Sequence, residues 1–264
     1  MRLLLPLLAL MASACHDARA DCFAPDTQLP ARRETLADPG LGASGRELAE
    51  ALYDLDLAAA KALLARDPRL ASLPIGAHHE MLTLALATCE PQALDLVLAA
   101  GADPDGRDKQ GLPLRLALRA TTPAPAARLL EAGASPNPRA NPMGPLRTAI
   151  TLNSLGAVRL LLDHRADPDA AEPSGNHALN TALDMEHFRI AELLLERGAN
   201  PWAVDATGGN LGTAVTSKML TKSPEEAEAQ RRLAKRLRGL GWPTSPPSPE
   251  RVLALVAAGN WPPR

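Results

Sequence analysis

The chain has 264 residues, a formal net charge of −2 and 22% charged residues, with acidic and basic residues mixed along its length. It has no basic stripe and only 2% aromatic residues, so it offers little for phosphate neutralisation or base stacking, and nucleic acid is not expected as a partner. The 25 prolines and 18 glycines recur along the chain, which indicates punctuation between short helices.

The N-terminal segment 1–20 has the pattern of a bacterial export signal, with Arg2 ahead of an apolar run over 3–11. That run is shorter than the roughly 20 residues that a transmembrane helix needs. Two interpretations of the cleavage stay open. Residues 12–15 resemble a lipobox, in which Cys15 becomes the lipidated first residue, and residues 18–20 fit an A-x-A site that would release a soluble protein. Both predict a mature protein in the periplasm, either soluble or lipid-anchored to the outer membrane and facing the periplasm.

Residues 21–44 contain Pro25, Pro30 and Pro39 and show no helical period, which predicts an irregular leader. Cys22 and Cys89 remain after either cleavage, in a compartment where a disulfide can persist. They are a candidate disulfide. The alternative is that Cys89 is a small buried side chain and Cys22 stays a thiol in the leader.

The rest of the chain repeats. A segment of the form L-x-x-A followed by an aliphatic residue begins at positions 82, 114, 146, 179 and 211, with spacings of 32, 32, 33 and 32, and a weaker copy begins at Leu48. A four-residue turn such as Gly101-Ala102-Asp103-Pro104 recurs from positions 133, 165 and 198. Two landmarks with one period predict a stack of supersecondary units.

Each unit is expected to contain two short helices. The L-x-x-A segment forms an inner helix, a second apolar segment forms an outer helix, and the glycine of the turn follows in the left-handed conformation that favours glycine. Arg165 stands where the other three turns have glycine, and if it adopts the same left-handed conformation it carries backbone strain. Because one unit cannot bury its own apolar face, stability must come from stacking.

The pattern resembles the ankyrin repeat over residues 45–242. Residues 111–117 (GLPLRLA) are similar to the family's G-x-T-P-L-H-x-A segment, and 129–135 and 194–200 to its L-L-x-x-G-A-D ending. The resemblance implies an all-α ankyrin-repeat solenoid of about six helix-turn-helix units with short hairpin-like finger loops. The family's histidine, which commonly hydrogen-bonds between neighbouring loops, is replaced here by Thr83, Arg115, Arg147, Asn180 and Gly212.

The two ends are expected to cap the stack. Helices over 45–53 and 57–65 form the first pair. Ser223-Pro224-Glu225-Glu226 predicts the start of a last outer helix, with Ser223 as N-cap and a glutamate placed for a capping box. Residues 243–264 are predicted to hold a C-terminal capping helix, which follows Ser248, and a tail.

No catalytic set, metal site or cofactor site is predicted. The adjacent His78 and His79 are interpreted as a solvated turn, and no pair of histidines has the spacing of a zinc protease. The carboxylates of Asp103-Pro104-Asp105 and Asp167-Pro168-Asp169 fall in turns, where aspartate is common, and they lack the rest of a calcium loop.

The resemblance implies instead a concave binding face made of the fingers and the inner helices. Trp202 is a candidate hot spot, with packing on the neighbouring finger as the alternative. The predicted partner-binding residues are Arg107, Asp108, Lys109, Arg115, Arg139, Arg147, Asn176, Asn180, Trp202 and Asp205. The expected partner is a folded protein in the envelope, the chain itself is expected to be a monomer, and membrane contact is expected only through the lipid anchor.

Similarity to exported bacterial ankyrin proteins implies two specific roles. One is an immunity protein that inhibits a secreted toxin or hydrolase, and the other is an accessory protein that supports a periplasmic enzyme such as a catalase. The alternative of another class, an enzyme, has no catalytic constellation to support it.

Overall fold

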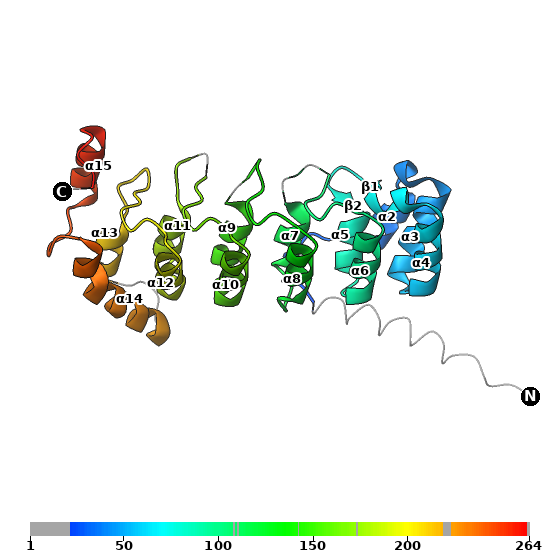
Figure 1. Ribbon diagram of the computed structural model, residues 1–264, viewed down its shortest axis with the longest axis horizontal. Helices are drawn as coiled ribbons and strands as arrows, with labels where there is room; N and C mark the ends of the chain where they lie inside the picture. The colour runs from blue at the N-terminus through cyan, green and yellow to red at the C-terminus, as the bar shows by residue number, and fades with distance from the viewer. Residues whose placement is uncertain are drawn as a thin grey trace, which may run out of the picture. The chain divides into compact units, whose positions relative to one another are not determined.

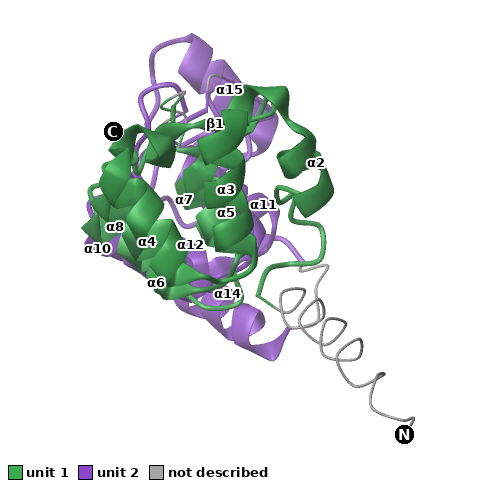
Figure 2. Cartoon of the chain, turned by 90° about the vertical axis from the view of Figure 1, so that its right-hand side faces the viewer, with its two compact units in different colours: residues 1–135 green, residues 136–264 purple. Residues whose placement is uncertain are grey.

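The computed structural model describes residues 22–107, 109, 111–141, 143–172, 174–218 and 223–262. The predicted signal peptide, its lipidation candidate Cys15 and the finger residue Asp108 lie outside the described residues. Within the described ranges, no helix is both long and apolar enough to cross a membrane. The chain divides into two compact units, residues 1–135 and 136–264 (Figures 1 and 2).

The described part of the first unit contains three helix pairs. They are α3 (Gly42–Tyr53) with α4 (Leu57–Arg66), α5 (Met81–Ala87) with α6 (Pro91–Ala99), and α7 (Leu112–Ala117) with α8 (Ala124–Glu131). Each inner helix packs on its own outer helix, and α5 packs on both α3 and α7, as the predicted stacking requires. The leucines that begin the repeated segment, Leu48, Leu82 and Leu114, are each 0% exposed and form the core of this unit.

The second unit repeats the arrangement over its described residues. Its pairs are α9 (Gly144–Thr151) with α10 (Leu155–Asp163), α11 (Ala178–Asp184) with α12 (Phe188–Glu196), and α13 (Leu211–Thr216) with α14 (Pro224–Arg236). With the first unit, this gives six helix pairs in the described ranges and confirms the predicted all-α helix-turn-helix organisation.

The finger loops are hairpin-like, as expected. In the first unit the 3-10 helix η2 (Pro68–Ser72) leads into β1 (Pro74–Ile75), which pairs antiparallel with β2 (His79–Glu80). In the second unit two fingers close with single bridges, Ala171 to His177 and Val204 to Asn210. Each hairpin delivers the chain to the start of the next inner helix.

The predicted irregular leader is corrected by the structure. It contains the helices α2 (Arg32–Ala37) and η1 (Pro39–Leu41), and α3 already begins at Gly42. Thr35 of α2 is 1% exposed and its hydroxyl lies 2.9 Å from that of Tyr53, which donates to the carbonyl of Pro30. Figure 2 shows α2 beside α3, on the side away from the outer helices α4, α6 and α8. These short helices depend on contacts with α3, which an apolar period in the sequence does not reveal.

The start of the leader runs along the end of α7. Phe23 is 5% exposed and forms a β-bridge with Ala120, and the Ala24 amide donates to the Arg119 carbonyl at 3.0 Å. The Arg119 guanidinium donates in turn to Thr27 Oγ1 at 3.0 Å. The leader is therefore part of the folded first unit, although it lies far from α7 in sequence.

The C-terminal end follows the predicted cap signals in part. α14 begins after the N-cap Ser223, whose hydroxyl accepts from the Glu226 amide at 3.3 Å. The expected capping box is wrong, because the buried Glu226 carboxylate accepts instead from the Arg189 amide of α12 at 2.9 Å. α15 (Pro249–Ala257) begins after Ser248 as predicted, but of its residues only Val252 is buried. Helix α15 therefore covers little of the C-terminal end of the second unit.

Candidate functional site

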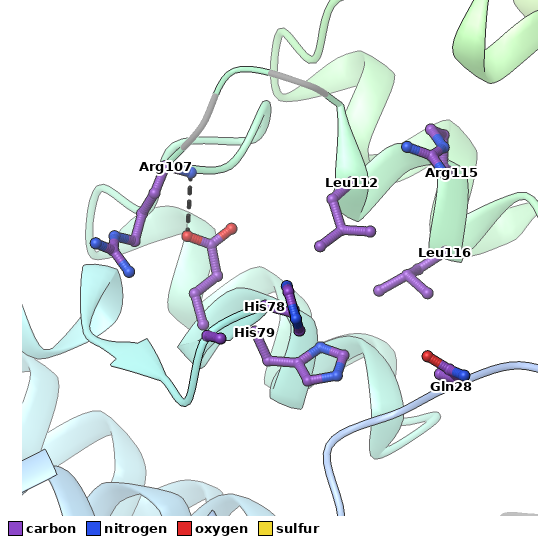
Figure 3. A pocket seen from close by; sticks show the side chains of 9 residues that line it. Gln28, His78, His79, Arg107, Leu112, Arg115 and Leu116 are labelled. Atoms are coloured by element: carbon purple, nitrogen blue, oxygen red, sulfur yellow. Dashed lines mark hydrogen bonds between the residues drawn. The ribbon is translucent and has the colours of Figure 1, made fainter. Parts of the chain in front are cut away.

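A hollow of about 760 Å³ lies beside the finger hairpin of the first unit. Figure 3 shows its walls: the imidazoles of the hairpin on one side, α7 on the other, and the leader at the lower edge. Nine residues line it: Gln28, Ala77, His78, His79, Glu80, Arg107, Leu112, Arg115 and Leu116. Two of the sequence-predicted partner residues, Arg107 and Arg115, thus meet at one site.

The hairpin supplies two histidines that the sequence interpretation assigned to a solvated turn. His78 is exposed, but His79 is half-buried on β2 opposite Ile75. Burial lowers the pKa of His79 below its ordinary value of 6.5, and the neighbouring His78 adds to this effect. Nδ1 of His79 is buried and has no hydrogen-bond partner among the described residues. The interpretation as a solvated turn is therefore corrected for His79.

Helix α7 supplies the opposite wall. Gly111 precedes it in the left-handed conformation, at φ 70°, and Pro113 lies in its first turn, so the start of the helix is fixed. Leu112 and Leu116 give the hollow an apolar side, and Arg115 lies between them on the same helix. Arg115 is half-exposed and forms no ion pair with any described residue.

Glu80 joins the hairpin to the next finger. Its carboxylate accepts from the Arg107 amide at 3.2 Å and is 8% exposed. A Cβ at Gly106, which has φ +78°, would lie 2.9 Å from this carboxylate, so the turn at Gly106 depends on glycine. Glu80 thereby fixes the backbone of Arg107, whose side chain is exposed at the rim and forms no ion pair with a described residue.

Three further predicted residues lie on exposed surface. Lys109 forms an ion pair with Asp103, and Arg147 forms one with Glu172. Arg139 is exposed on its finger. Because exposed ion pairs contribute little and are easily exchanged, the two paired cations stay accessible to a partner.

The prediction that Asn180 contacts a partner is corrected, whereas that for Asp205, which is half-buried, stays a prediction. Asn180 is 1% exposed, and its Nδ2 donates to the carbonyls of Ala203 and Gly209 at 3.4 and 3.0 Å. Asp205 accepts from the amides of Thr207 and Gly209 at 2.6 and 2.9 Å. Both side chains hold the last finger together, so Asn180 makes the loop-bridging contact for which the family uses a histidine.

Asn176 is also internal in part, because its Nδ2 donates to Thr181 Oγ1 at 3.3 Å, at the start of α11. Its backbone carbonyl accepts from the Glu172 amide at 2.9 Å and closes the finger. Asn176 is half-buried, so it offers a partner only a small surface.

Trp202 packs within the molecule, but on two tryptophans near the C-terminus and not on the neighbouring finger, which was the alternative from the sequence. Its ring stacks on Trp242 with centroids 4.5 Å apart and meets Trp261 edge-on at 5.6 Å. The indole N–H of Trp261 donates to the Trp202 carbonyl at 2.9 Å, and that of Trp242 to the Pro201 carbonyl at 3.2 Å. These three residues, the tryptophan cluster, close the C-terminal end of the second unit.

The paired aspartates of the turns have structural partners. Asp105 accepts from the Ser135 amide at 2.6 Å, and Asp169 accepts from the Asn200 amide at 2.6 Å, so each reaches the turn of the following repeat. This agrees with the interpretation of these carboxylates as turn residues. The described residues contain no group of three or more His, Cys, Asp and Glu side chains placed to hold a metal ion.

Sequence reasoning missed most of the hollow. Two signals were available: the adjacent histidines directly before an inner helix, and the basic Arg115 within the next inner helix. Gln28 carried no signal, because the leader's position along α7 depends on contacts such as that of Arg119 with Thr27. The leucines of α7 were indistinguishable from core residues.

Comparison with known proteins agrees with the geometry. Residues 116–205 match the family model for ankyrin repeats, with three copies. The chain also resembles the crystal structure of the ankyrin repeat domain of Bcl-3, a unique member of the IkappaB protein family, at 23% identity and a TM-score of 0.58. That alignment covers 80% of this chain and 97% of the other. No curated protein sequence matches this chain. The chain therefore contains ankyrin repeats and has the ankyrin-repeat fold, and such repeats imply a protein-binding module.

Proposed function

We propose that this chain is a non-catalytic module of the bacterial envelope that binds and inhibits one folded protein, a secreted toxin or hydrolase. The N-terminal sequence pattern supports the location, and the repeats support protein binding. The inhibitory role follows from the resemblance to exported ankyrin proteins. The interface is expected to be of standard size, about 1600 Å² in total.

The observation that carries the proposal is the state of Arg107 and Arg115. They lie on a finger and an inner helix, and neither guanidinium forms an ion pair with a described residue. In the same unit, Arg128 of the outer helix α8 differs from them, because it pairs with Asp95 at 2.5 Å. Arginines that form no ion pair with a described residue, on a scaffold held by its own hydrogen bonds, can bind a partner with little ordering cost, and arginine is enriched among interface hot spots.

The test is affinity capture from envelope extracts with the full chain. The test variant is Arg107→Ala/Arg115→Ala, and the matched control is Arg66→Ala/Arg128→Ala, which removes the same charge from outer helices of the same unit. We expect wild type and control to recover one partner equally, and the test variant to recover much less, since truncating hot-spot arginines costs about 2 kcal/mol or more each.

The identity of the captured protein decides the role. Capture of a toxin or hydrolase that loses activity on binding supports the inhibitory role. Capture of a catalase that gains activity would contradict inhibition and support the accessory role instead. Recovery of no partner by any version, together with turnover of a substrate by the pure chain, would overturn the binding function itself. Mass spectrometry of the mature N-terminus in the envelope fraction tests the location.

A further inference from the structure

We propose that the hollow between the first finger hairpin and α7 receives a glutamate or aspartate side chain from a surface loop of the protein partner. This inference rests on the proposed function and specifies the chemistry of recognition at one site. It is carried by four features of the hollow: its charge, its apolar wall, its unpartnered imidazole nitrogen and its accessibility.

The charge of the hollow favours an anion. The lining includes two arginines, Arg107 and Arg115, and one carboxylate, Glu80. With neutral histidines its net charge is +1. The Glu80 carboxylate is buried and already accepts from the Arg107 amide, so the charge of its oxygens is partly compensated within the fold. An entering carboxylate meets guanidinium groups that have no ion-pair partner among the described residues, where charge-assisted hydrogen bonds are strong.

The apolar wall favours a carboxylate on a hydrocarbon stem over a bare anion. Leu112 and Leu116 of α7 line the side opposite the imidazoles (Figure 3). The methylene groups of a glutamate would lie against these leucines while its carboxylate reaches Arg115. A hollow of about 760 Å³ also holds more than one side chain, which fits a protein loop. Because Gln28, His78 and Arg107 are exposed, the hollow opens to the solvent.

His79 contributes a ring nitrogen that has no hydrogen-bond partner among the described residues. Its Nδ1 is buried without a partner in the described part of the chain. When the imidazole is protonated this nitrogen is an N–H donor, so a ligand that accepts a hydrogen bond satisfies it. The ionisable groups around His79 come from three elements, and the leader adds only an uncharged side chain: Glu80 and His78 on the hairpin, Arg107 on the next finger, Arg115 on α7, and Gln28 on the leader.

This arrangement gives binding a pH dependence. Burial, with a smaller effect of the neighbouring His78, lowers the pKa of His79, and a bound carboxylate would raise it. The complex then binds a proton that the unliganded protein does not, so affinity rises as the pH falls toward the lowered pKa of unliganded His79. Below the pKa of His79 in the unliganded protein, the gain levels off.

The test uses the full chain and a pair of peptides in a backbone-amide NMR titration. The probe is Ac-Ala-Leu-Glu-Glu-Leu-Ala-NH2, its matched control has both glutamates replaced by glutamine, and inorganic phosphate is titrated separately. We expect the acidic peptide to shift amides in 77–80 and 111–116 and to bind at least about tenfold more tightly than the glutamine peptide. Arg115→Gln should weaken binding by about tenfold, and the outer-helix control Arg128→Gln should leave it unchanged.

Three results would overturn the inference: equal binding of the two peptides, no amide shifts in these two segments, or equal shifts with phosphate alone. A flat pH profile for wild type, or an unchanged profile in His79→Gln, would remove the role of His79. Failure here is distinguishable from failure of the proposed function. If affinity capture still recovers a partner that Arg107→Ala/Arg115→Ala loses, the binding module stands and only its acidic ligand is wrong.

Discussion

Arg165 follows α10 at the position where the turns that begin at Gly101, Gly133 and Gly198 have glycine. Its φ of 69° shows that it adopts the left-handed conformation, and the glycines have φ between 97° and 98°. A Cβ at any of the three glycines would meet nothing within 4 Å, so the cost of a side chain there comes from the backbone and not from crowding. The left-handed conformation costs a residue with a Cβ roughly 1–2 kcal/mol.

Arg165→Gly is therefore expected to raise the free energy of unfolding by about 1 kcal/mol, measured by chemical denaturation. The exposed side chain of Arg165 offers little to lose. A clear loss of stability in this variant would show that the arginine side chain makes a stabilising contact that outweighs the backbone term.

Asn180 stands at the position of the family's histidine and, like that histidine, makes hydrogen bonds to a neighbouring loop. Asn180→Ala leaves the carbonyls of Ala203 and Gly209 without their side-chain donor in a buried environment. We expect a loss of about 1–3 kcal/mol in the free energy of unfolding. The matched control is Asn260→Ala at an exposed position, expected to change stability by less than about 0.5 kcal/mol. Equal effects in the two variants would mean that these hydrogen bonds do not hold the finger.

At the scale of helices, α13 and the tryptophan cluster are packed in close contact. Gly212 lies in α13, and a Cβ there would come within 2.6 Å of Trp242 and 2.7 Å of Pro246. Gly156 lies in α10, where a Cβ would meet nothing within 4 Å. The same substitution is therefore expected to have opposite effects in two helices of the second unit.

Gly212→Ala should destabilise the protein by about 1–3 kcal/mol through overpacking against Trp242. Gly156→Ala should stabilise it by up to about 1 kcal/mol, because alanine loses less backbone entropy in a helix. The chain has three tryptophans, all in the cluster, so fluorescence reports on this end of the molecule and circular dichroism on all helices. If Gly212→Ala leaves both the fluorescence and the melting curve unchanged, the contact between α13 and Trp242 is not tight.

At the scale of the molecule, the period of the two sequence landmarks was sufficient to predict the helix pairs, because each unit repeats the same local contacts. Features that depend on residues far apart in sequence were not predictable in this way. The leader helix α2 depends on Thr35 meeting Tyr53, and the hollow needs Gln28, His79 and Arg115 together. The buried position of Asn180 could not be predicted either, because it depends on where the following finger places the carbonyls of Ala203 and Gly209.

The candidate disulfide between Cys22 and Cys89 belongs to this scale, because it would tie the leader to a repeat that is distant in sequence. The disulfide itself stays a prediction, but the structure brings both cysteines to one turn. The Cys22 carbonyl accepts from the Thr121 amide at 2.8 Å, and Cys89 lines a small hollow together with Thr122. The leader is already fixed there by Phe23, so little further ordering is needed for the bond to form in an oxidising compartment.

If the bond forms, it should stabilise the folded chain by roughly 4 kcal/mol on the chain-entropy model, since it closes a long loop in the unfolded state. Cys22→Ser, Cys89→Ser and the double variant should then lose the same amount of stability, because each removes the same bond, and reduction of the wild type should match them. Thiol titration of the exported, unfolded protein should find no reactive thiol before reduction and two after it. Two reactive thiols before reduction, or additive losses in the two single variants, would show that the leader is held by its hydrogen bonds and Phe23 alone.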